Sequence, residues 1–176
     1  AAGAVTKTYG AGAFTNTLTG AQAGVTYTSS APSVAVVDAN GQVTVLAAGT
    51  ATITAAAAEN EDYKAGSASY NLTVDKKSLT VTAGSYRVTK TYDGTTSMGT
   101  ASGSLTVSGV LEKDVNEVTV SAAGGAYNDP NVGGQSAMTV SLSLSGSGAN
   151  NYQLGNSTVS VPCSITPKTI VPAITV

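Results

Sequence analysis

The chain of 176 residues contains no His, no Trp, one Cys and one Phe. Without His it cannot form a Ser–His–Asp arrangement, and it lacks the side chain that most often acts as a general base. A Ser–Lys pair remains conceivable, but no motif marks one. The single Cys cannot close a disulfide within the chain. We therefore expect no enzyme activity, and the sequence identifies no catalytic, cofactor-binding or metal-binding residues.

Charge is also scarce, with eight basic and ten acidic residues and a net charge of −2. No basic stripe is present, which argues against a nucleic-acid partner. No apolar run approaches the roughly 20 residues that a membrane-spanning helix requires, so we expect no membrane insertion. No secretory signal is recognisable in these residues. A β-rich chain with almost no Cys is typical of bacterial extracellular domains.

Thr, Ser, Ala, Gly and Val are abundant instead, and they alternate with a period of two, as half-buried strands do. One face is apolar and the other is Ser/Thr, which indicates antiparallel sheets exposed to water on one side. Asp38–Gly41 separates two such runs and has the Asn-Gly pair of a tight hairpin. The clearest alternating segments are 50–55, 68–74, 138–144 and 159–165.

A repeated motif divides the chain. Thr6–Gly10 (TKTYG) recurs as Thr89–Gly94 (TKTYDG), and Asn71–Val81 resembles the segment around Cys163–Lys168. Repetition of this kind indicates consecutive copies of one structural unit. We predict an all-β chain of two tandem immunoglobulin-like antiparallel β-sandwich modules. The expected boundaries are 1–75 for the first module and 76–168 for the second, with 169–176 as a linker or the first strand of a following module.

Residues 25–54 contain a succession of four characteristic segments, Val25–Ser30, Pro32–Asp38, Asn40–Val43 and Ala48–Thr54. On these segments residues 25–54 resemble the bacterial Ig-like domain, group 2. The resemblance departs from the commonest pattern at Tyr27, where Trp is frequent, and in the additional segment Glu59–Tyr63.

The second half resembles the YDG repeat of large bacterial surface proteins. The matching elements are Lys90–Thr96, Asp114, Tyr127–Gly133, Leu144–Gly146, Asn151-Tyr152 with Leu154, and Ile165–Lys168. Together the two resemblances imply an adhesin-like or stalk protein displayed outside a bacterial cell, and they imply no catalytic residues.

Several features could carry chemistry. Cys163 shares a strand face with Val161 and Ile165, so we expect a buried, unreactive thiol rather than a nucleophile. Glu59–Asp62 gathers hard oxygen ligands that could hold Ca²⁺, but it lacks a spaced ligand pattern, and a solvated acidic turn is the favoured interpretation. Asn128–Asn131 is interpreted as a turn.

Lys7 and Lys90 have the same parity as apolar neighbours, so each ammonium would point inward and need a partner. A Lys buried beside Asn or Asp and a second carboxylate is the arrangement that forms isopeptide cross-links in some bacterial stalk domains. The favoured alternative is a Lys near a strand end, with a packed stem and an ammonium that reaches water.

These observations favour a structural spacer or stalk of an extracellular, cell-surface or secreted bacterial protein, with neighbouring modules as its partners. The alternative is an adhesive binding module for a host glycan or protein. It would need an exposed aromatic or apolar patch. Tyr63 and Tyr127 are candidates for exposed aromatics, whereas Tyr70 and Tyr92 fall on apolar faces. An accessory domain of an enzyme is a third possibility. We expect a monomer, although residues 169–176 could pair between molecules by strand addition.

Overall fold

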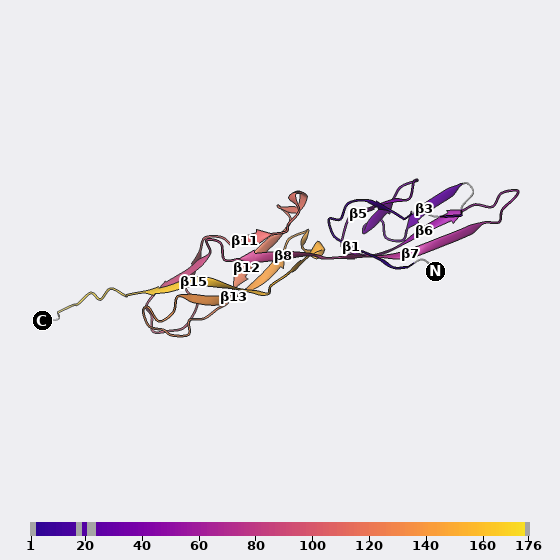
Figure 1. Cartoon of the computed structure of the whole chain (residues 1–176). Helices are drawn as coiled ribbons and strands as arrows, with labels where there is room; N and C mark the ends of the chain where they lie inside the picture. The colour runs from indigo at the N-terminus through magenta and orange to yellow at the C-terminus, as the bar shows by residue number, and fades with distance from the viewer. Residues whose placement is uncertain (1–2, 17–18, 21–23, 175–176) are drawn as a thin grey trace. The chain divides into compact units, whose positions relative to one another are not determined.

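The computed structural model describes residues 3–16, 19–20 and 24–174. Within them the regular structure is strand apart from the two 3₁₀ helices η1 (Glu112–Asp114) and η2 (Ala149–Asn151). None of the helices in these ranges is long and apolar enough to cross a membrane. The chain divides into two compact units, Ala1–Lys77 with Asn150–Gln153, and Ser78–Ala149 with Leu154–Val176. The predicted all-β fold class is confirmed (Figure 1).

The first unit is a sandwich of two sheets with strand orders β1-β7-β6-β3 and β2-β5-β4. Apolar side chains of both sheets meet between them, and Ala35, Val43 and Leu72 have no exposed surface. The strands alternate between buried and exposed residues as the sequence predicts. Their bounds are β1 (Val5–Thr8), β2 (Phe14–Thr15), β3 (Val25–Ser29), β4 (Ala35–Val37), β5 (Gln42–Val45), β6 (Gly49–Ala57) and β7 (Gly66–Asp75).

The predicted hairpin joins β4 to β5. Gly41 has a φ of 78°, a conformation that side chains with a Cβ rarely adopt. The Asp38 carboxylate accepts hydrogen bonds from the backbone N–H groups of Asn40 and Gln42, at 2.9 and 2.8 Å. The turn residues therefore fix the register of the two strands, as Asx turns do.

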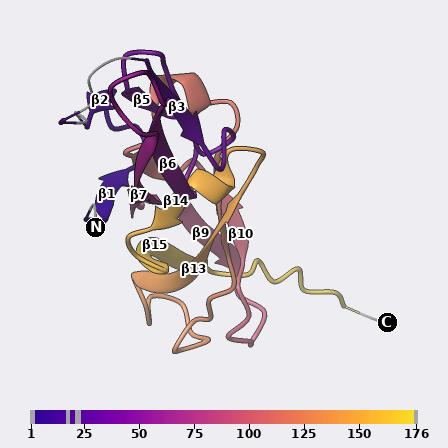
Figure 2. The ribbon, with the colours of Figure 1, turned by 90° about the vertical axis from the view of Figure 1, so that its right-hand side faces the viewer.

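The second unit contains the sheet β10-β9-β15-β13-β12 and most of the sheet β11-β8-β14, whose residues Lys77, Tyr152 and Gln153 are grouped with the first unit. Its core is the cluster of Val88, Tyr127, Met138, Val140, Val161, Cys163 and Ile165. Figure 2 shows β9, β10, β13 and β15 of the five-stranded sheet next to one another. The strands are β8 (Lys77–Thr82), β9 (Arg87–Thr91), β10 (Thr100–Ser102), β11 (Thr106–Ser108), β12 (Thr119–Ala123), β13 (Ala137–Ser145), β14 (Tyr152–Leu154) and β15 (Thr158–Thr166).

Two strand pairs are parallel, which the alternating pattern does not indicate. β1 lies parallel to β7, with Lys7 opposite Val74. β9 lies parallel to β15, with Lys90 opposite Ile165. The repeated Thr-Lys-Thr-Tyr motif thus forms the same substructure twice, an early strand of a unit aligned in parallel with its last strand.

Beyond β15, residues 167–174 form no strand. Ile170, Val171 and Ile174 are 84 %, 84 % and 92 % exposed. The predicted first strand of a following module, 169–176, therefore has no sheet partner over 169–174, and its last two residues lie outside the described ranges.

Candidate functional site

The most elaborate polar arrangement in the second unit surrounds Lys90. Its side chain is only 7 % exposed, and its ammonium lies 2.8 Å from the Asp93 carboxylate. The same nitrogen donates to the backbone oxygen and to the hydroxyl of Thr95, at 2.6 and 3.1 Å. These three acceptors match the three N–H donors of an ammonium. We refer to Lys90, Asp93, Thr95 and Tyr127 as the lysine cluster.

The motif sequence explains the local geometry. Gly94 has a φ of 77°, which lets the chain turn sharply just after β9. Oδ1 of Asp93 accepts hydrogen bonds from the backbone N–H and the hydroxyl of Thr95, both at 2.9 Å. The Lys-Thr-Tyr-Asp-Gly-Thr segment is therefore a closed turn around an ammonium, held by hydrogen bonds among Lys90, Asp93 and Thr95.

These contacts perturb the acidity of Asp93. The hydrogen bond from Lys90, followed by those from the backbone and hydroxyl of Thr95, lowers the pKa of Asp93 from 3.8 to about 2. Because the carboxylate stays ionised, the ion pair persists throughout the physiological pH range. The cluster holds charges in fixed positions and leaves no uncommitted base or nucleophile on Lys90.

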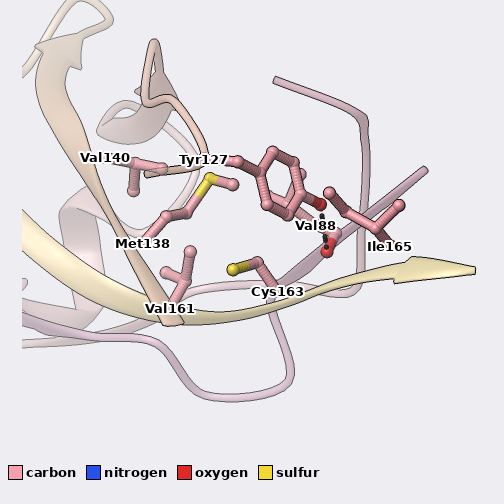
Figure 3. Packing of buried hydrophobic residues seen from close by; sticks show 7 residues of the cluster. All are labelled: Val88, Tyr127, Met138, Val140, Val161, Cys163 and Ile165. Atoms are coloured by element: carbon pink, nitrogen blue, oxygen red, sulfur yellow. Dashed lines mark hydrogen bonds between the residues drawn. The ribbon is translucent and has the colours of Figure 1, made fainter. Parts of the chain in front are cut away.

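Tyr127 is the member of the lysine cluster that comes from outside the turn. Its ring is 2 % exposed, and the Lys90 ammonium lies 5.2 Å from its centroid. Its hydroxyl donates to the backbone oxygen of Ser164 on β15 at 2.9 Å and lies 3.3 Å from that of Val88 on β9 (Figure 3). Burial raises the pKa of Tyr127, so the hydroxyl remains a donor. One side chain thus connects both parallel strands.

The expectation that Tyr127 could be an exposed aromatic is wrong. Gly124 and Gly125 precede it with φ values of 70° and 106°, so the chain turns after β12, and the Tyr127 N–H donates to the backbone oxygen of Thr96. Tyr92 is also a correction, because it is 39 % exposed although its parity places it on an apolar face. β9 ends at Thr91, so the alternation no longer holds one residue later.

Lys7 occupies the equivalent register in the first unit, but its surroundings differ. Gly10 stands where the second copy of the motif has Asp93. The Lys7 ammonium lies 4.6 Å from the centroid of the Phe14 ring, a cation–π contact. Of the two lysines considered for an isopeptide bond, Lys90 has a carboxylate partner at ion-pair distance, and Lys7 faces an aromatic ring.

Cys163 and the acidic segment Glu59–Asp62 are the next candidates for chemistry. Cys163 is buried as expected, with 6 % exposure, and burial raises the pKa of its thiol. In the acidic segment, Asn60 accepts hydrogen bonds from the backbone N–H groups of Asp62 and Tyr63, and Glu59 pairs with Lys64 at 2.9 Å. Within the described ranges, no three His, Cys, Asp or Glu side chains gather as a metal site would require.

Asn128–Asn131 is a turn, as predicted. The Asp129 carboxylate accepts hydrogen bonds from the backbone and side-chain N–H groups of Asn131, at 2.9 and 2.8 Å. Its oxygen atoms thus serve the local chain conformation, as Asx turns do.

The first unit contains a cavity of about 360 Å³, whose lining includes Tyr27, Tyr70, Asn16 and Ile53. The Tyr70 hydroxyl is buried, and no group among the described residues meets both hydrogen-bond distance and angle with it, although the Asn16 side chain lies near enough to interact. Burial raises the pKa of Tyr70, and this interaction with Asn16 partly offsets the rise. Sequence reasoning missed this cavity because its lining comes from segments far apart in the chain.

Comparison with known families follows the same division. Residues 75–160 match the YDG domain. Residues 9–59 match the intimin immunoglobulin-like domain. The predicted order of an Ig-like module followed by a YDG module is confirmed. From here on, the two units are called the Ig-like module and the YDG module. The lysine cluster lies in the YDG module, and its Asp93 is the Asp of the Tyr-Asp-Gly residues 92–94.

Similarity to individual proteins is low. No curated protein matches the chain. A SusE-like surface-located polysaccharide-binding protein from the heparin utilisation locus of Bacteroides thetaiotaomicron is 14 % identical, with a TM-score of 0.32 over 94 % of this chain and 33 % of its own. The chain thus spans one third of that protein. Repeats EC1-3 of Drosophila N-cadherin are 10 % identical, with a TM-score of 0.27 over 95 % of this chain and 64 % of theirs.

Proposed function

We propose that the two modules are structural spacers of a secreted or cell-surface bacterial protein and perform no catalysis. The observation that carries this proposal is the direction of the polar atoms in the lysine cluster. Lys90 bonds to its own turn, and Tyr127 bonds to the backbone of two strands of its own unit. A catalytic or binding group must instead keep its polar atoms available to a ligand.

The family matches support the extracellular part of the proposal. Intimin-type Ig-like domains and YDG domains occur in adhesin-like surface proteins, so the parent chain is expected to act outside the cell. In this setting the modules hold another part of the parent chain away from the cell surface. Their partners are the neighbouring modules, and the fragment itself is expected to be a monomer.

One observation favours the alternative, an adhesive module that recognises a host glycan or protein. The cavity in the Ig-like module presents two Tyr side chains, and the buried Tyr70 hydroxyl could donate to a ligand. Aromatic walls with a few polar groups are typical of small-ligand sites. If the chain binds a glycan, this cavity is the expected position.

A binding screen separates the two functions. The 176-residue chain is tested against a glycan array and a panel of host matrix proteins, and each hit is repeated with Tyr70→Phe, which removes the hydroxyl and keeps the ring. The spacer predicts no specific hit. A micromolar interaction that Tyr70→Phe weakens would establish the binding role, and a hit that tolerates this change would place binding elsewhere and still refute the spacer.

A further inference from the structure

Both modules pair an early strand with their last strand in parallel. In the Ig-like module the ladder aligns Val5–Thr8 with Leu72–Asp75, and the Tyr9 N–H then donates to the Asp75 backbone oxygen at 2.8 Å. In the YDG module Val88–Thr91 aligns with Cys163–Thr166, and the Tyr92 N–H donates to the Thr166 oxygen at 2.8 Å. In both modules the parallel ladder therefore ends with a hydrogen bond from the backbone N–H of the Tyr in the repeated motif.

The direction of these strands determines how a module responds to tension along the chain. In the YDG module β8 precedes β9 and pairs with β11, so tension from the N-terminal side reaches β9 after β8 has detached, and the chain leaves the module through the C-terminal end of β15. Because β9 and β15 are parallel, this tension then pulls β9 backward and β15 forward along a common axis. The hydrogen bonds between them are then loaded together. An antiparallel hairpin such as β6–β7, pulled at its two free ends, opens one bond at a time.

We propose that the β9–β15 pair of the YDG module is a mechanical shear clamp that resists unfolding when the chain is stretched. This proposal deepens the spacer function and rests on it, because a spacer under flow or adhesion carries tension from one end to the other. Resistance to stretching depends on the unfolding rate rather than on equilibrium stability. A ladder whose bonds must break together raises the barrier that sets that rate.

Side chains reinforce this ladder in the YDG module. The Tyr127 hydroxyl contacts a backbone oxygen on each of the two strands, so sliding one strand past the other disrupts its position. The Thr166 hydroxyl donates to the backbone oxygen of Lys90 across the same pair at 3.3 Å. The Lys90 ammonium secures the turn that immediately follows β9. The lysine cluster thus lies at the C-terminal end of the β9–β15 ladder, where the chain leaves β15.

Pulling geometry tests the clamp directly. In a Cys163→Ala background, Arg87→Cys with Lys168→Cys attaches one handle at the first residue of β9 and the other just beyond the C-terminal end of β15, which shears the pair. Thr96→Cys with Lys168→Cys attaches both handles at the same end, which unzips it. All three attachment residues are exposed. Shear should require a several-fold higher force at the same loading rate, whereas equal forces would overturn the proposal.

A matched pair of variants tests the reinforcement by Tyr127. Tyr127→Phe keeps the ring and removes the hydroxyl, and Tyr92→Phe is the control because its ring is 39 % exposed. At constant force in the shear geometry, Tyr127→Phe should unfold about tenfold faster, since a hydrogen bond of about 1.4 kcal/mol corresponds to one decade in rate. Tyr92→Phe should behave as the parent chain. Equal rates for all three chains would remove Tyr127 from the clamp.

The outcomes also separate the clamp from the spacer function. Equal forces in the two geometries, with no ligand in the binding screen, would refute the clamp and leave the spacer. Unequal forces together with a specific ligand would refute the passive spacer and leave the clamp as a property of a binding protein. Circular dichroism of each variant before pulling confirms that its β structure is intact.

Discussion

Tyr127→Phe should also lower the equilibrium stability of the YDG module. The ring is 2 % exposed and Phe fills nearly the same volume, so we expect no cavity term. What is lost is the 2.9 Å hydrogen bond to the Ser164 backbone oxygen, which leaves a partly buried acceptor with one partner fewer. A bond of this type contributes about 1 kcal/mol, and the unpaired acceptor brings the loss to about 1–2 kcal/mol.

Hydrogen exchange measures this loss for the YDG module alone. The Tyr92 amide, which donates to the Thr166 oxygen, reports the opening of the β9–β15 ladder. Its protection should fall by about tenfold in Tyr127→Phe, which corresponds to the expected 1–2 kcal/mol. Tyr127→Ala, which also removes the ring, should cost about 3–5 kcal/mol. The melting temperature should fall by about 4–8 °C for each kcal/mol in a module of this size.

Two results would refute this reasoning. Unchanged protection in Tyr127→Phe would show that the hydroxyl contributes no net stability. A loss as large as that of Tyr127→Ala would show that the hydroxyl, and not burial of the ring, dominates. Tyr92→Phe, which alters a partly exposed ring in the same module, should change stability by less than about 0.5 kcal/mol.

Three further predictions concern other residues. The Asp93 carboxyl should titrate near pH 2 by NMR. Its stabilising contribution is fully present above the unfolded pKa near 3.8 and should be lost as the pH falls toward 2. In Lys90→Met the pKa of Asp93 should rise, and an unchanged pKa would contradict the ion pair. Iodoacetamide should label Cys163 only after denaturation, as mass spectrometry can show, because burial raises the pKa of the thiol and shields it; rapid labelling of the folded chain would disprove this. Gly146→Ala should lower the stability of the YDG module in urea unfolding by more than Gly94→Ala does. Both glycines have positive φ, but only a Cβ at Gly146 would lie 2.2 Å from a backbone oxygen. Equal losses would show that the backbone around Gly146 shifts to accommodate the added Cβ.

The sequence alone indicated the strands, the hairpin at Asp38–Gly41 and the succession of two modules. These features depend on neighbouring residues, because a period of two places one set of side chains in the core and Asn-Gly adopts the turn conformation. The inward parity of Lys90 and the burial of Cys163 follow from the same local rule. The family resemblance rests on such local motifs as well.

Only the tertiary structure decided which strands pair and in which direction. An alternating strand has the same pattern beside a parallel or an antiparallel neighbour, so the β9–β15 ladder could not be inferred. Tyr127 lies outside any predicted strand, and its burial depends on contacts with segments about 40 residues away in the chain. Loop closure of this kind is set by packing and carries no local signal, which is why the partners of Lys90 and Tyr127 emerged only from the fold.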